Sequence, residues 1–178
     1  MDQQAPARTQ HWTRSAPWIT AGIAAVVLVL DQSSKLWATS TLRAGERTPL
    51  IGDALGIKLI YNPGAAFSIG TGATWIFTLV AAGAVVAGGW YAWQVRSRPW
   101  AVCLGFLLGG AVTHLLDRLL RAPSFAQGHV VDFIAYFDWF VGNVADIALF
   151  AGGVLLLVLS WMGFTLRPEP DRPAEQAE

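Results

Sequence analysis

Two carboxylates, Asp132 and Asp146, are the residues of this sequence best suited to hydrolytic chemistry. They stand 14 positions apart (146 − 132), and neither has an obvious cationic neighbour along the chain. Two such groups brought close together cannot both ionise easily, so one keeps a proton and polarises a carbonyl while the other activates water. The spacing alone is weak evidence, because an unrelated loop aspartate and a helix-capping aspartate would show the same pattern.

Two histidines offer a second kind of hydrolytic site. The spacings His114-x-x-Asp117 and His129-x-x-Asp132 can supply imidazole and carboxylate ligands to a metal ion. The sequence has no HExxH pattern of the kind that zinc peptidases use. A metal-dependent hydrolase therefore ranks below the carboxylate pair, and neither a metal nor another cofactor is predicted.

The composition places these groups in a membrane. Of the 178 residues, 54% are hydrophobic and 13% are charged, which is more apolar surface than one small soluble core can bury. Twelve basic and 12 acidic residues give a net charge of zero, so no overall field favours nucleic acid and no such partner is predicted. The single cysteine, Cys103, excludes an internal disulfide and a multi-cysteine metal site.

Four apolar stretches are each near the ~20 residues that a spanning helix needs. They cover residues 17–38, 72–95, 99–120 and 140–163. The predicted fold is therefore an all-α membrane protein with four transmembrane helices. The first stretch, which follows Arg8 and Arg14, also has the form of a cleavable signal peptide. Against that alternative, Asp31 and Lys35 stand four positions apart, where they can pair on one helix face.

The segments outside the spans are short. Residues 40–71 hold several prolines and glycines around the mixed run from Ile57 to Tyr61, which predicts a short strand or hairpin in a small extracytoplasmic β-type region. The predicted domain organisation is an N-terminal tail (1–16), a four-span membrane domain (17–163) and a C-terminal tail (164–178). The polar, proline-containing tails are expected to be disordered.

The connection between the second and third stretches is tight and basic, with Arg96 and Arg98, which favours a cytoplasmic location for it and for both termini. Alternating spans then bring polar residues together at the outer boundary. They are Asp31, Lys35, Asn62, Gly64, Asp117, Arg118, Asp132, Asn143 and Asp146. Ionisable groups at such depth usually face a bundle interior or a watery cavity. A proton- or substrate-coupled carrier is one alternative, but four spans without an internal repeat argue against a complete carrier.

Several of these residues also have a structural explanation. Asp31 with Lys35, and Asp117 with Arg118 or Arg121, can compensate each other as ion pairs. Tryptophans near the span ends are typical of an interfacial belt. Glycines of the second and third spans are expected to permit close helix packing; they are Gly83, Gly88, Gly89, Gly105, Gly109 and Gly110.

Five ordered segments resemble the motifs of the lipoprotein signal peptidases, also called signal peptidase II. These bacterial enzymes remove signal peptides from prolipoproteins after a diacylglyceryl group is placed on the cysteine. The segments are Asp31-Gln32-Ser33-Ser34-Lys35, Tyr61-Asn62-Pro63-Gly64-Ala65-Ala66-Phe67-Ser68, Gly109-Gly110-Ala111 with Asp117-Arg118, Val130-Val131-Asp132-Phe133-Ile134, and Asn143-Val144-Ala145-Asp146.

The resemblance implies an aspartic endopeptidase of the bacterial inner membrane, with Asp132 and Asp146 as its catalytic dyad near the outer leaflet. Its partners would be membrane lipid and diacylglyceryl-modified prolipoproteins, which it would cleave just before the lipidated cysteine. By the same resemblance, Asn62, Arg118 and Asn143 would hold the substrate backbone or order the site, supported by Asp31, Lys35 and Asp117. Gly64 and His114 are further candidates for binding substrate or ordering the site.

Two positions depart from the pattern of that family. Thr113-His114 stands where the family usually has Gly-Asn, and Gly142 stands where it usually has Phe. A histidine can supply one donor and one acceptor in place of the asparagine, and it can change its charge between mildly acidic and neutral pH. Activity is therefore expected to survive, with a shifted pH profile or substrate preference.

Overall fold

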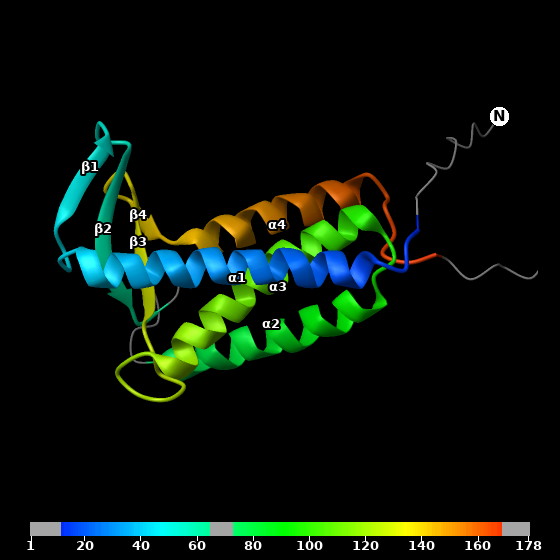
Figure 1. Cartoon of the computed structure of the whole chain (residues 1–178), viewed down its shortest axis with the longest axis horizontal. Helices are drawn as coiled ribbons and strands as arrows, with labels where there is room; N and C mark the ends of the chain where they lie inside the picture. Colours follow the sequence, from blue (N-terminus) through cyan, green and yellow to red (C-terminus); the bar gives the residue numbers. More distant parts are fainter. Residues whose placement is uncertain (1–11, 65–72, 169–178) are drawn as a thin grey trace, which may run out of the picture.

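A computed structural model describes residues 12–64 and 73–168. Within these ranges four helices are long and apolar enough to span a membrane: α1 (Ala16–Thr41), α2 (Thr74–Gln94), α3 (Arg98–Leu120) and α4 (Val144–Trp161). They run along the long axis of the molecule, and the described chain begins and ends at the same end of the bundle (Figure 1). The prediction of four transmembrane helices is confirmed.

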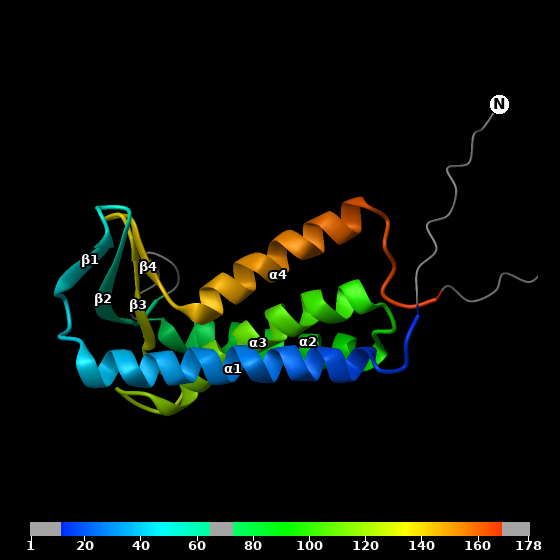
Figure 2. The ribbon, with the colours of Figure 1, turned by 45° about the horizontal axis from the view of Figure 1, so that its top comes forward.

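A small antiparallel sheet lies across the opposite end of the bundle (Figures 1 and 2). Its strands pair in sequence order: β1 (Arg47–Ile51), β2 (Leu55–Asn62), β3 (Val130–Tyr136) and β4 (Phe140–Gly142). The predicted hairpin is thus confirmed as β1–β2, and β3 and β4 extend it. Pairing of β2 with β3 places Ile60 opposite Asp132, so the sheet register sets the position of that carboxylate.

The start of the last helix differs from the prediction. The fourth apolar stretch was expected to form a helix from residue 140, but β3 and the short strand β4 precede the helix, and α4 begins at Val144. Hydropathy does not distinguish a short buried strand from the first turn of a spanning helix. The helix begins where Asn143, in extended backbone, accepts a hydrogen bond from the Asp146 amide at 3.0 Å.

The central helix of the bundle is α3, which packs against each of the other three. A Cβ added at Gly109 would lie 2.8 Å from Val27 Cβ on α1, and one at Gly110 would lie 2.5 Å from Leu149 Cγ on α4. The close-packing role predicted for the glycines of the third span is therefore confirmed. For Gly83 and Gly89 of α2 that prediction is wrong, because a Cβ there would meet nothing within 4 Å.

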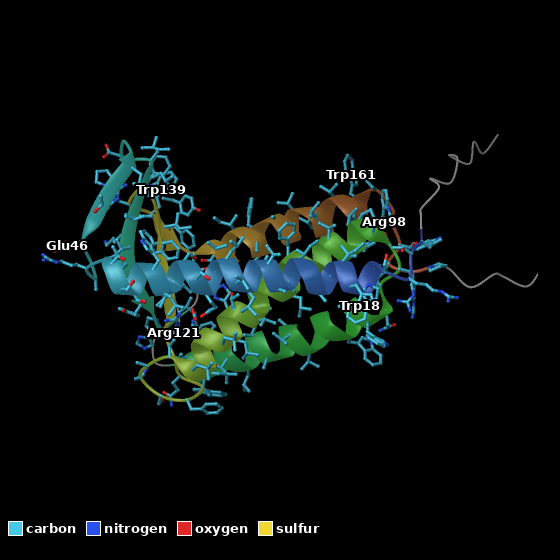
Figure 3. All side chains as sticks on the ribbon, viewed as in Figure 1. Trp18, Glu46, Arg98, Arg121, Trp139 and Trp161 are labelled. Atoms are coloured by element: carbon cyan, nitrogen blue, oxygen red, sulfur yellow. The ribbon has the colours of Figure 1, made fainter. Side chains whose placement is uncertain are left out.

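Exposed tryptophans gather at the two ends of the bundle. Trp18 and Trp161, with exposed fractions of 76% and 90%, lie at the end that carries the chain ends, and Trp139 lies at the sheet (Figure 3). This is the distribution of an interfacial aromatic belt.

Residues 164–168 fold back onto the end of the bundle away from the sheet. The indole Nε1 of Trp100 donates to the Phe164 carbonyl at 3.0 Å, and the amide of Arg96 donates to the Leu166 carbonyl at 3.0 Å. The start of the predicted C-terminal tail is therefore packed. Residues 1–11 and 169–178, which make up the rest of the two tails predicted to be disordered, lie outside the described residues.

One buried lysine connects the helices near the sheet. The Nζ atom of Lys35 lies 2.7 Å from Asp31 Oδ2 and 2.7 Å from Asp117 Oδ2, and the three side chains are at most 1% exposed. The predicted pair on α1 is thus present and is joined by a carboxylate of α3. A cleavable leader is a poor description of the first stretch, because its charged residues are built into the bundle.

These two carboxylates also bind other elements of the fold. Asp31 Oδ1 accepts the amide of Ala145 on α4 at 2.9 Å, and Asp117 Oδ2 accepts the amide of Val131 on β3 at 3.3 Å. Arg121 Nε lies 2.7 Å from Asp117 Oδ1, so two cations balance two carboxylates. This charge-neutral group, the Lys35 network, consists of Asp31, Lys35, Asp117 and Arg121.

We predict that Lys35→Met strongly destabilises the protein. The substitution leaves two buried carboxylates with Arg121 as their only cation in this network, and breaking a buried pair on one side costs about 3–5 kcal/mol. The check is thermal unfolding of the detergent-purified protein, followed by intrinsic tryptophan fluorescence. Lys58→Met is the matched control, since Lys58 is half-buried on β2 outside the network. Equal unfolding temperatures for the two variants would contradict the prediction.

We predict that Gly110→Ala lowers stability whereas Gly153→Ala does not. Both substitutions gain helix propensity, but a Cβ at Gly110 would also lie 3.0 Å from the Ala145 carbonyl oxygen, while one at Gly153 meets nothing within 4 Å. Overpacking typically costs about 1–3 kcal/mol. The same unfolding assay tests this, and a Gly110→Ala protein as stable as Gly153→Ala would show that α3 and α4 can separate without cost.

Candidate active site

Asp132 lies on β3 with its carboxylate buried among amides. The Nδ2 atom of Asn62 donates to its Oδ2 at 3.0 Å, and the Nδ2 atom of Asn143 donates to its Oδ1 at 2.5 Å. Burial, followed by the nearby carboxylate of Asp146, raises the pKa of Asp132 to about 6, against the opposing effect of the two amides and of His114. Asp132 therefore retains a proton in mildly acidic solution.

Asp146 lies in the first turn of α4 and is more accessible, because its side chain is 30% exposed whereas Asp132 is buried. Its Oδ2 accepts the amide of Asn143 at 2.9 Å, and its Oδ1 lies 3.1 Å from the Nε2 atom of His114. Each oxygen of this carboxylate is thus held by one contact. The position of His114 lets it perform a donor role toward Asp146.

Asn143 joins the two carboxylates. Its side-chain amide group donates to Asp132, its side-chain carbonyl accepts the amide of Asp146, and its own amide donates to Asp146. The last two bonds form the capping box of α4. The same residue that starts the helix therefore brings together two carboxylates that belong to separate segments of the sequence.

Both carboxylates line a cavity of about 290 Å³. Its polar side also includes Asn62, Gly64, His114 and Arg118. The apolar side comes mainly from the helices α2, α3 and α4, with contributions from β3 and β4; its residues are Phe77, Val80, Ala81, Ala84, Ala111, Val130, Phe140 and Leu149. Such a cavity can accept an amide group at its polar end and an apolar chain beside it.

Arg118 is buried and holds main-chain carbonyl groups around the cavity. Its Nη1 atom donates to the carbonyls of Asn62 at 3.1 Å, Pro63 at 3.0 Å and Gly128 at 3.1 Å, and its Nη2 atom donates to that of Gly64. Asp117 was predicted to pair with Arg118 or with Arg121, and in the described residues its ion pair is with Arg121. The arginine thus connects the end of β2 to the segment before β3.

Asn62 is the last residue of β2, and it lines the cavity together with Gly64. Besides its contact with Asp132, its Oδ1 accepts the amide of Gly64 at 3.0 Å. Gly64 is buried, and its carbonyl is bound by Arg118. The second half of the motif that begins at Tyr61, residues 65–68, lies outside the described residues.

Gly142 makes room for an aromatic ring next to the carboxylates. A Cβ at this position would lie 2.7 Å from Phe140 Cε1 and 2.8 Å from Asp146 Oδ2. Phe140 therefore occupies space that a side chain at Gly142 would need, and its ring lines the cavity. The sequence pattern did not single out Phe140, because in sequence it is one of many apolar residues at the start of a span.

Gln32 lies in the motif that begins at Asp31, but the sequence predicted no role for it. Its Nε2 atom donates to Asp117 Oδ1 at 3.1 Å, and its Oε1 accepts from Arg121 Nη2 at 3.3 Å. Thr74 and Thr78 of α2 were missed altogether; their hydroxyls donate to the carbonyls of Pro63 at 2.8 Å and Ala126 at 2.7 Å. Polar residues inside an apolar stretch were the available signal.

The alternative metal site of His114, Asp117, His129 and Asp132 is not supported. His114 contacts Asp146, and Asp117 is held by Lys35 and Arg121. Across residues 12–64 and 73–168, no three His, Cys, Asp or Glu side chains are grouped so that they could hold a metal ion.

Similarity to known proteins points to one family. Residues 23–162 match the family model described as signal peptidase (SPase) II. A lipoprotein signal peptidase of Rhodococcus jostii (strain RHA1) is 43% identical over 93% of this chain and 80% of its own length. One of Mycobacterium avium (strain 104) is 47% identical over 80% of this chain and 78% of its own length.

A solved structure described as a bacterial membrane enzyme has the same fold. It superposes with a TM-score of 0.75 at 23% sequence identity, covering 93% of this chain and 100% of that one. Since the family model covers most of the chain, and relatives above 40% identity match it over most of their length, the chain belongs to the signal peptidase II family and is a membrane peptidase.

Proposed function

We propose that this peptidase removes the signal peptide of diacylglyceryl-modified prolipoproteins, cutting just before the lipidated cysteine, with Asp132 and Asp146 as its catalytic dyad. The observation that carries the proposal is the position of Asn143, which binds both carboxylates at the polar end of a cavity with apolar helices on its other side. The relatives named lipoprotein signal peptidases supply the substrate class.

The difference in burial supports different roles for the two carboxyl groups. Asp132 is nearly inaccessible and its pKa is raised to about 6, so it is the carboxyl that holds the proton. Asp146 is more accessible and is oriented by two donors, so it is the base that contacts water. Two carboxyl groups in unlike surroundings are the arrangement that separates acid from base.

The reaction then proceeds through a tetrahedral diol. Asp146 takes a proton from water as the water oxygen adds to the scissile carbonyl carbon, while Asp132 gives its proton to the carbonyl oxygen. As the C–N bond breaks, Asp146 returns its proton to the departing nitrogen and Asp132 recovers one from the diol. The products are the carboxyl end of the signal peptide and a free amino group on the lipidated cysteine.

The apolar side of the cavity suits a substrate that stays in the bilayer. Val80, Ala81 and Leu149 give it an apolar lining from α2 and α4 on which a signal-peptide helix can pack. A diacylglyceryl chain keeps the cysteine at the interface, so the bond before it arrives at the depth of the dyad. Asn62 and Arg118 order the main chain on the polar side.

The proposed orientation places the dyad near the outer leaflet of the inner membrane and both termini in the cytoplasm. Arg14, Arg96, Arg98 and Arg167 lie in the segments at the end of the bundle away from the sheet, as Figure 3 shows for Arg98. An excess of arginine in short connections favours the cytoplasmic side. The sheet and the dyad would then face the opposite side.

We predict that Asp132→Asn and Asp146→Asn each abolish cleavage. Loss of a positioned acid or base costs about 10²–10⁴-fold in rate. The measurement is cleavage of a diacylglyceryl-modified prolipoprotein in membranes, with each variant inserted at normal level and with or without chelator. Asp138→Asn is the control, because Asp138 is exposed in the turn between β3 and β4. Retained cleavage in either dyad variant would refute the dyad. Inhibition by chelator would instead favour a metal-dependent hydrolase.

We predict that kcat/KM falls as the pH rises through about 6, because Asp132 with its raised pKa then loses the proton it must donate. His114 lowers the pKa of Asp132, so His114→Asn should raise that pKa and move the fall to higher pH with cleavage retained. Parallel pH profiles of the two proteins test this. A flat profile between mildly acidic and neutral pH, or a shift to lower pH in the variant, would contradict it.

A further inference from the structure

A second cavity, of about 340 Å³, lies at the end of the bundle away from the sheet. It runs between α1 and α2, and Leu108 of α3 contributes to its floor. Leu108 is ten residues from the start of α3, so the cavity reaches roughly 15 Å along the helix axis from that end. The cavity shares no lining residue with the one that holds Asp132 and Asp146.

Two arginines stand at the mouth of this cavity. Arg14 is exposed just before α1, and Arg96 is half-buried just after α2. Arg96 Nη1 donates to the main-chain carbonyls of Trp93 and Val95 at 3.1 and 2.8 Å, which orients the guanidinium without neutralising it. Within residues 12–64 and 73–168, neither arginine forms an ion pair. The mouth is therefore positively charged.

The body of the cavity is open and apolar. Trp18 of α1 and Trp93 of α2 line it with exposed fractions of 76% and 75%, and Figure 3 shows Trp18 near the end of the bundle. Gly89, about one turn of α2 before Trp93, also lines the cavity and leaves it open, since a Cβ there would meet nothing within 4 Å. Tryptophans at this level and a groove below them are suited to the glycerol region and one acyl chain of a lipid.

We propose that this cavity binds an anionic phospholipid of the adjacent leaflet. The phosphate lies between Arg14 and Arg96, and an acyl chain passes between Trp18 and Trp93 along Gly89. Charge complementarity selects this occupant over a signal peptide, because the N-terminal region of a signal peptide is itself positively charged. The inference does not depend on the peptidase mechanism, since the cavity lies at the other end of the bundle from the dyad.

The test is a titration of the full-length detergent-purified protein with phosphatidylglycerol or phosphatidylcholine, with bound lipid counted by native mass spectrometry. We expect one site that prefers phosphatidylglycerol by about tenfold or more. Arg14→Gln and Arg96→Gln should each weaken phosphatidylglycerol binding about fivefold and leave phosphatidylcholine unchanged. Gly89→Leu should weaken both lipids, because it fills the groove.

Two matched variants keep the test specific. Arg98→Gln removes an exposed arginine at the same end but outside the cavity lining, and Gly83→Leu adds a side chain at another open glycine of α2. Both should bind phosphatidylglycerol as the unmodified protein does. Equal affinity for the two lipids, or an equal loss in Arg98→Gln, would overturn the proposal. Displacement of the lipid by millimolar inorganic phosphate would also overturn it, by identifying free phosphate as the ligand.

Discussion

An ammonium group can remain inside an apolar helix bundle only when carboxylates lie beside it. Because Lys35 is buried, the helices around it must supply those carboxylates. Asp31 and Asp117 each lie 2.7 Å from its nitrogen, which binds α1 to α3. Their other contacts reach the amides of Ala145 and Val131, next to Asp146 and Asp132. The carboxylates that balance one lysine thus also hold the strand and the helix that carry Asp132 and Asp146.

The proposed dyad consists of two carboxyl groups in unlike surroundings. Asp132 is enclosed by amides on the sheet, whereas Asp146 is partly open at the start of a helix. Asn143 couples them because the cap of α4 and the hydrogen bond to Asp132 use the same side chain. Rigid secondary structure on both sides holds such a pair more accurately than two loops would.

Hydropathy and motif spacing predicted the four spans, the β1–β2 hairpin and the ion pair on α1, because each depends on residues that are neighbours in sequence. The strand β3 was not predicted, and α4 was predicted to begin four residues too early. The reason is that a short apolar run is compatible with either a buried strand or a helix. The sequence shows that position 142 has no side chain. It does not show that the Phe140 ring occupies the space, because that contact depends on the path of β4.

By itself the sequence determined that the chain lies in a membrane, and it named the carboxylates available for chemistry, because composition and residue type do not depend on folding. Only the tertiary structure decided which carboxylates are neutralised by buried cations and which line the cavity. Asp117 is held by Lys35 of another helix, and Asp132 and Asp146 are joined through Asn143. Burial and hydrogen bonding, which set the pKa of Asp132, arise from contacts between distant segments.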